Sequence, residues 1–276
     1  SVRTQLVLHE LYRQRGEAAG AQRALEAAAA LAPDQPDVIH ARLVAAAAAQ
    51  RFDEVVTLAT AHASTARPQP ELFLSAAALL GASPAHVDAA RDLCQRAAEL
   101  APGDVRPHLA LGDLAYAHGD IDRAVEAYQG VLRMQPAQPE ALNNLAWILA
   151  ERRADYEAAL AYARQAVAAR PDDANFRDTL GFILRHLPGK LDEAREEFRR
   201  SVELAPADSG LRARSLLHLA QVCGALDDRA ALAQHLQEAL AIEGRTPVFT
   251  PAERAEIERL LQAAQGTERV SVAEPH

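Results

Sequence analysis

The sequence has few residues that could build a disulfide, redox or metal site. Only two cysteines, Cys94 and Cys223, occur in 276 residues. None of the ten histidines has another histidine three or four positions away, so no single helix face supplies two imidazoles to one metal. We therefore expect no metal and no cofactor, and we expect both cysteines to be buried thiols.

Aromatic residues, lysine and long apolar runs are also scarce. Aromatics make up 4% of the chain, with one tryptophan, and Lys190 is the only lysine. The net charge of −9 argues against nucleic-acid binding, which needs clustered cations. No run approaches the ~18 apolar residues of a membrane helix, so we expect no direct membrane insertion. The expectation is a soluble protein, and the sequence does not distinguish the bacterial cytoplasm from the periplasm.

The motifs of common enzyme classes are missing. His9 and Glu10 begin like a zinc-protease helix, but Arg13 stands where the second histidine is needed. The chain has no glycine-rich phosphate loop and no Gly-x-Ser-x-Gly. Asp227 and Asp228 fall in a turn, where helix capping explains them better than acid–base work. We therefore expect no catalytic residues and no enzyme activity.

What the sequence does contain is alanine and a helical spacing of apolar residues, clearest between Val105 and Pro136. Two amphipathic segments there are joined by a turn at Gly119. Apolar and small residues share one face of each segment: Leu111, Gly112 and Ala115 in the first, and Ala124, Tyr128 and Val131 in the second. Gly112 and Ala124 are small where the paired helices must cross, so the pattern predicts two closely packed helices.

This stretch resembles the tetratricopeptide repeat, a helix-turn-helix unit of 34 residues with Leu-Gly, Gly, Ala, aromatic and closing Pro positions. The resemblance implies an all-α, right-handed solenoid. We predict seven such units, spanning residues 2–35, 36–69, 71–104, 105–138, 139–172, 174–207 and 209–244. In the third unit, Ser83 and Pro84 are expected to form the turn, with Pro84 opening the second helix.

A capping helix is predicted at 250–265, followed by an extended tail at 266–276. Thr250 is its expected N-cap and Glu253 completes a capping box. Glu253 and Glu256 are expected to point outward with the other charged residues of this helix. No polar-faced helix precedes Val2, so we expect the chain to be one portion of a longer polypeptide.

In this family the first helix of each unit lines a concave groove, and the resemblance implies which residues face it. The peptide-binding residues expected on that basis are Arg106, Asp113, Tyr116, Asn143, Asn144, Trp147, Asn175, Asp178, Phe182, Arg185, His218 and Gln221, with Arg214 on the same face. Asparagine both donates to and accepts from a peptide backbone. Trp147 and Phe182 occupy the same position in successive units, where they either form a shelf for an apolar side chain or pack on each other.

The leading hypothesis is a non-catalytic module that binds a peptide or protein segment in the concave groove. One alternative is a structural scaffold or oligomerisation spacer in a bacterial assembly, with envelope export as one setting. Another is a regulatory module of a larger enzyme. Self-association through the tail or the exposed first unit is also among the expected partnerships.

Overall fold

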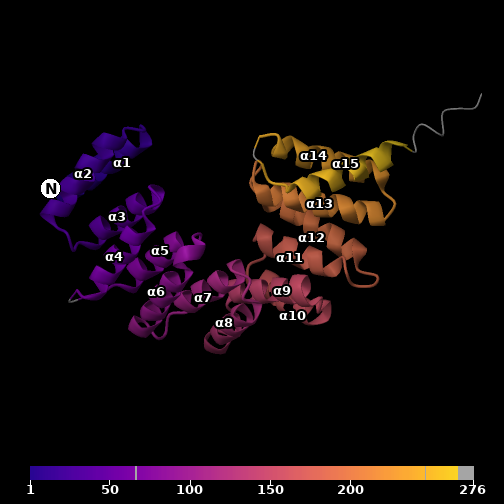
Figure 1. Cartoon of the computed structure of the whole chain (residues 1–276). Coiled ribbons are helices and arrows are strands. Elements are labelled where there is room, and N and C mark those ends of the chain that lie inside the picture. The colour runs from indigo at the N-terminus through magenta and orange to yellow at the C-terminus, as the bar shows by residue number, and fades with distance from the viewer. Residues whose placement is uncertain (66, 246, 267–276) are drawn as a thin grey trace, which may run out of the picture. The chain divides into compact units, whose positions relative to one another are not determined.

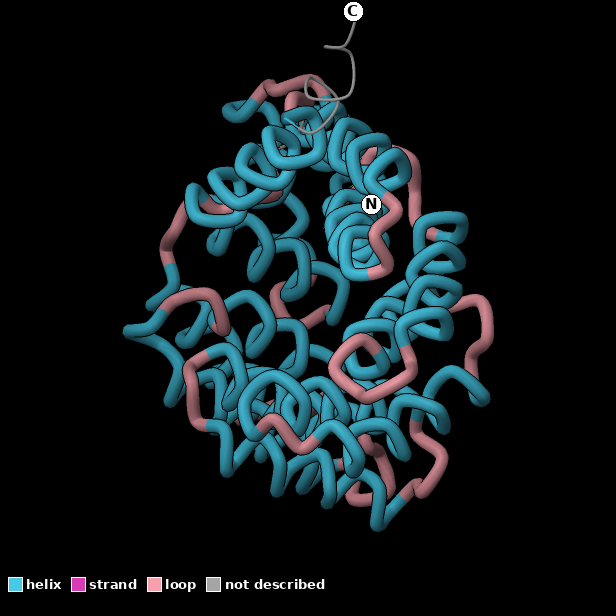
Figure 2. Tube along the Cα trace, turned by 90° about the vertical axis from the view of Figure 1, so that its right-hand side faces the viewer, coloured by secondary structure: helices cyan, strands magenta, loops and turns pink. Residues whose placement is uncertain are grey.

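All regular secondary structure in the described part of the chain is helical. The structure is a computed structural model of the 276-residue chain, and it describes residues 1–65, 67–245 and 247–266. Helices joined by loops and turns make up these residues, and no strand occurs among them (Figure 2). The predicted all-α fold is confirmed. None of the helices in these ranges is long and apolar enough to cross a bilayer.

Contacts divide the chain into two compact parts, the N-terminal half (Ser1–Pro136) and the C-terminal half (Ala137–His276). The even spacing of the predicted units across residue 136 gives no sign of this division. Each half is described by itself.

The N-terminal half contains four pairs of helices that follow one another along the chain (Figure 1). They are α1 (Val2–Gln14) with α2 (Ala18–Leu31), α3 (Pro36–Ala48) with α4 (Phe52–Ala63), α5 (Pro70–Leu80) with α6 (Val87–Leu100), and α7 (Arg106–Ala117) with α8 (Ile121–Met134). The first helices also contact each other, α3 with α5 and α5 with α7. A connected buried layer therefore runs from α3 to α7.

The C-terminal half repeats this arrangement and adds a final helix. Its helices are α9 (Pro139–Arg153) with α10 (Tyr156–Ala169), α11 (Ala174–Leu184) with α12 (Leu191–Leu204), α13 (Gly210–Ala225) with α14 (Arg229–Glu243), and then α15 (Pro251–Gly266). The first helices α9, α11 and α13 again contact one another in order. This places their exposed faces along one side of the half.

Close packing within the pairs comes from an aromatic ring set against a glycine. A Cβ atom added to Gly112 would lie 2.6 Å from the Tyr128 ring, and one added to Gly181 would lie 2.9 Å from the Phe198 ring. Tyr128 and Phe198 are fully buried. The two helix backbones can approach because neither glycine carries a side chain.

The third pair differs from the predicted start of its second helix. Pro84 opens a short 3₁₀ helix, Pro84–His86, and α6 begins only at Val87. The Ser83 hydroxyl lies 2.9 Å from His86 Nδ1, and His86 Nε2 lies 3.1 Å from an Asp53 oxygen. These side-chain contacts hold the tight 3₁₀ turn, so the α-helix starts three residues later than expected.

The start of α15 is a capping box, as predicted. The Thr250 N–H donates to Glu253 Oε2 at 2.7 Å, and the Glu253 N–H donates to Thr250 Oγ1 at 3.2 Å. The outward placement predicted for Glu253 and Glu256 is wrong, because both are half-buried and Glu256 accepts a hydrogen bond from Gln221 of α13. Helix α15 packs on α14 through the fully buried Ile257. The tail predicted at 266–276 lies outside the described residues beyond Gly266.

Both cysteines are buried free thiols, as predicted. Burial raises the pKa of the Cys94 thiol to about 11. Cys94 belongs to the N-terminal half and Cys223 to the C-terminal half. Neither thiol has the lowered pKa of a reactive cysteine.

The loop before α15 is held by a buried carboxylate, Glu243. Glu243 accepts hydrogen bonds from the Val248 N–H and, at 3.0 Å, from the Phe249 N–H, and it pairs with Arg254. The Val248 hydrogen bond, with those from Phe249 and Arg254, outweighs desolvation and holds the pKa of the Glu243 carboxyl below its usual 4.5. The charged form of Glu243 is therefore favoured by folding.

We expect Glu243→Gln to destabilise the C-terminal half at pH 7, with a loss that fades in acid. A lowered carboxyl pKa contributes stability above the unfolded-state value, and this is lost as the pH falls through the folded-state value. The difference in urea midpoint between wild type and variant should therefore shrink below a pH of 4.5. Glu238→Gln, at an exposed position of the same helix, serves as control. A difference that is constant with pH would contradict the prediction.

Candidate functional site

A cavity of about 440 Å³ lies in the C-terminal half, on the side formed by the first helices of its pairs. The residues that line it come from α9, α11, α13 and the region of α15: Asn143, Asn144, Trp147, Glu151, Asn175, Asp178, Thr179, Phe182, Leu211, Arg214, His218 and Glu253. Eight residues predicted for the groove face, Arg214 among them, are thus brought together around one cavity. Their role in binding remains a prediction.

The asparagines combine buried and accessible amides. Asn143 is only 3% exposed, and its Oδ1 has no hydrogen-bond partner among the described residues. Its Nδ2 donates to Asn144 Oδ1 at 3.4 Å, while Asn144 is half-buried and Asn175 is exposed. A buried acceptor without a donor is costly and rare in proteins. Asn143 therefore offers an acceptor that the described residues leave unused.

The structure of the Trp147–Phe182 pair is compatible with both alternatives for it, a shelf for a ligand side chain and packing of the two rings on each other. The Trp147 and Phe182 ring centroids lie 4.9 Å apart at an angle of 50°, so the rings pack on each other. Both residues are half-buried, and both line the cavity. Phe182 also lies 5.9 Å from the His218 ring and beneath the Arg185 guanidinium, at 4.8 Å. Phe182 is therefore the centre of a cluster of Trp147, His218 and Arg185 side chains at the cavity wall.

Asp178 is engaged within the protein. It is 7% exposed, and its Oδ1 accepts from the Ser215 hydroxyl at 2.7 Å and lies 3.2 Å from His218 Nδ1. Ser215 is also 2.9 Å from the Ser201 hydroxyl, which donates to the Ala174 carbonyl. This buried network joins α11, α12 and α13. Asp178 and His218 therefore fix the shape of the cavity, whether or not they contact a ligand.

Arg185 and Gln221 lie beside the cavity and do not line it. Arg185 donates to Gln221, which in turn donates to Glu256 of α15 at 3.1 Å. Burial lowers the pKa of the Arg185 guanidinium, while the charges of Asp178 and Glu256 oppose this. The chain of contacts ties α15 to α11 and α13, so the final helix completes the wall of the site.

Three predicted groove residues belong to α7 of the N-terminal half. Arg106 is paired with Asp104 at 2.6 Å and with Glu71 at 3.1 Å. Asp113 accepts a hydrogen bond from the Tyr128 hydroxyl at 2.6 Å. Tyr116 is half-buried. Arg106 and Asp113 therefore both have interaction partners within the N-terminal half.

The sequence analysis missed four residues of the lining: Glu151, Thr179, Leu211 and Glu253. Glu151 follows Trp147 by one helical turn, a spacing that indicates a shared face. Glu253 had been assigned only to capping. Partial burial opposes its charge, but its hydrogen bonds with Thr250 hold the pKa of the Glu253 carboxyl below its usual value. Arg214 and Glu151, two exposed residues of opposite charge, both line this cavity.

Across the described ranges, no group of three or more histidine, cysteine, aspartate and glutamate side chains is placed to hold a metal ion.

The family profile of the tetratricopeptide repeat matches residues 109–174 and, overlapping them, residues 149–209. Residues 109–209 carry tetratricopeptide repeats. The matched residues include α9 and α11, two of the helices that line the cavity. No curated protein sequence matches the chain.

Solved structures of tetratricopeptide repeat proteins share the fold. A MamA fragment from Desulfovibrio magneticus superimposes with a TM-score of 0.54 at 21% identity, over 66% of this chain and 99% of that one. A thermophilic repeat protein from Thermus thermophilus gives 0.54 at 18% identity, over 70% and 98%. Yeast Tom70 gives 0.66 at 16% identity, over 99% of this chain and 55% of Tom70. At these identities the likeness concerns the fold.

Tetratricopeptide repeats are in general protein–protein interaction modules, and proteins built from them are generally non-catalytic. The fold of this chain therefore supports an interaction module in that general sense. Membership of this class identifies neither the partner nor the surface that binds it.

Proposed function

We propose that this protein binds an extended segment of a partner protein in the cavity of the C-terminal half. The observation that carries the proposal is the unused acceptor of Asn143, which is buried at the lining of a 440 Å³ cavity. A backbone N–H of the partner would satisfy this oxygen after a small rotation of the amide. Asn144 and Asn175 offer further amide donors and acceptors along the same face.

The Trp147–Phe182 pair supports an apolar side chain in the bound segment. The Phe182 ring packs against Trp147, His218 and Arg185, so a ligand does not have to order it. Preordered aromatic surfaces lose little entropy on binding and are frequent centres of binding energy. The segment that fits is an extended one with an apolar residue over the rings and its backbone along the asparagines.

The test uses peptides selected from a random display library against the intact chain, followed by titration of Trp147 fluorescence. Because Trp147 is the only tryptophan, binding at the cavity should change its emission directly. We expect the double variant N144A/W147A to weaken binding at least about tenfold, by anisotropy of a labelled peptide. Gln165→Ala, at an exposed position of α10, is the matched control.

Two results would overturn the proposal. One is a set of selected peptides that bind N144A/W147A as tightly as wild type. The other is saturable peptide binding that leaves Trp147 emission unchanged. Either would favour the scaffold hypothesis, in which the cavity has no guest.

A further inference from the structure

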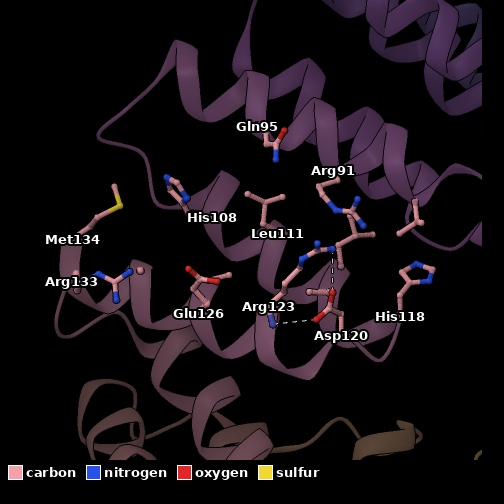
Figure 3. A pocket seen from close by; sticks show the side chains of 15 residues that line it. Arg91, Gln95, His108, Leu111, His118, Asp120, Arg123, Glu126, Arg133 and Met134 are labelled. Atoms are coloured by element: carbon pink, nitrogen blue, oxygen red, sulfur yellow. Dashed lines mark hydrogen bonds and ion pairs between the residues drawn. The ribbon is translucent and has the colours of Figure 1, made fainter.

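The N-terminal half has a larger open cleft that the proposed function does not use. This cleft has a volume of about 750 Å³ and lies between α6 and α8, with α7 at its base. Figure 3 shows Arg91 and Gln95 on one side and Arg123 and Glu126 on the other, with Leu111 between them. We call it the α6–α8 cleft. Its walls are the second helices of two successive pairs.

The charge of this cleft is opposite to that of the molecule. Three arginines, Arg91, Arg123 and Arg133, line it together with two carboxylates, Asp120 and Glu126, whereas the whole chain carries a net charge of −9. A local excess of guanidinium groups on an acidic protein attracts a partner of negative charge.

The arginines of the cleft are available to a partner. Arg91 pairs with Asp88 at 2.5 Å and Arg123 with Asp120 at 3.2 Å, both as exposed pairs three residues apart. Such exposed pairs contribute little stability, so a partner carboxylate can replace them at small cost. Arg133 is exposed near the end of α8. All three guanidiniums can therefore reach an acidic guest.

The middle of the cleft base is apolar, and two histidines of α7, His108 and His118, also line the cleft. Leu111 is half-buried, Leu114 lies beside it, and Met134 at one end is 40% exposed. Gly130 has no side chain to occupy the cleft from the α8 side. A Cβ added there would meet only the Arg133 side chain, at 3.5 Å. An apolar floor between charged walls matches a guest with one apolar face and one acidic face.

We propose that the α6–α8 cleft docks an acidic amphipathic helix of a partner protein. The walls α6 and α8 have 14 residues each, or about 21 Å at the rise of an α-helix. A helix of similar length lies in the groove between two helices, with its side-chain rows fitting between theirs. Its leucine-like residues cover Leu111 and Leu114, and its carboxylates face the arginines of both walls.

The test measures anisotropy of a fluorescein-labelled helical peptide of about 14 residues, with leucines on one face and glutamates elsewhere. A matched peptide carries glutamine in place of every glutamate. We expect the glutamate peptide to bind the intact chain at least about tenfold more tightly, and its affinity to fall as salt is added. The triple variant R91E/R123E/R133E should lose at least about tenfold in affinity for it.

The control variant R195E/R199E/R200E makes the same change of charge at exposed arginines of α12, and it should bind as wild type does. Gly130→Leu, which fills the cleft without changing its charge, should also weaken binding, and circular dichroism confirms that each variant is folded.

Equal binding of both peptides, or full affinity in the triple variant, would overturn the proposal. Self-association abolished by R91E/R123E/R133E would overturn it as well, because the occupant would be a second copy. The variant N144A/W147A should leave this binding unchanged, which separates it from the proposed function.

Discussion

Gly112→Ala is expected to destabilise the N-terminal half by about 2 kcal/mol. The new Cβ would lie 2.6 Å from the Tyr128 ring, a distance that side chains do not tolerate. Tyr128 is 1% exposed, and its hydroxyl donates to Asp113 at 2.6 Å, so the ring cannot move away without losing a hydrogen bond. Urea unfolding followed by circular dichroism at the helical band measures the loss.

Gly130→Ala is the matched substitution with the opposite expected sign. Gly130 lies inside α8, and a Cβ there meets only the Arg133 side chain, at 3.5 Å. Alanine should stabilise the helix by about 1 kcal/mol through its better helix propensity. The double variant G112A/Y128A should show that Gly112→Ala costs nothing once the ring is removed. If Gly112→Ala and Gly130→Ala shift the urea midpoint in the same direction, the packing argument is wrong.

Phe198→Ala is expected to destabilise the C-terminal half by about 4 kcal/mol. Phe198 is fully buried in α12, against Gly181 of α11 and 5.2 Å from the His218 ring. Truncation leaves a cavity between these helices, because Gly181 has no side chain to fill it. The same change removes the ring behind His218, so the emission of Trp147 in the folded variant should also shift.

Leu204→Ala in the same helix provides the comparison. Leu204 is 40% exposed, so its loss should cost about 0.5 kcal/mol. Urea unfolding of both variants at the same pH gives the difference directly. A cost for Phe198→Ala as small as that of Leu204→Ala would show that the Gly181–Phe198 contact does not hold the pair together.

The sequence by itself determined the helices and their pairing. Helical spacing of alanine, leucine and valine, together with the Gly112 and Tyr128 positions, predicted a closely packed hairpin, and the Thr250–Glu253 motif predicted the start of the last helix. These features depend on neighbours three or four residues apart, or on the partner helix across one turn. Local spacing is sufficient to predict them.

The binding surfaces depended on tertiary structure. The sequence placed Asn143 in a groove, but only packing shows that its amide is buried with an unused oxygen. Asp178 was predicted to bind a ligand, and in the structure it accepts a hydrogen bond from Ser215, 37 positions away. Glu253 was expected to face outward, yet it lines the cavity.

The α6–α8 cleft also could not be predicted from the sequence. Arg91, Leu111 and Arg133 belong to three helices and share no motif, and they meet only because α6 and α8 flank α7. The volume left between two helices depends on how far their backbones stand apart, which is set by side chains in other layers. Periodicity therefore determined that this chain folds as stacked helix pairs. Three-dimensional packing decided where those pairs leave room for a partner.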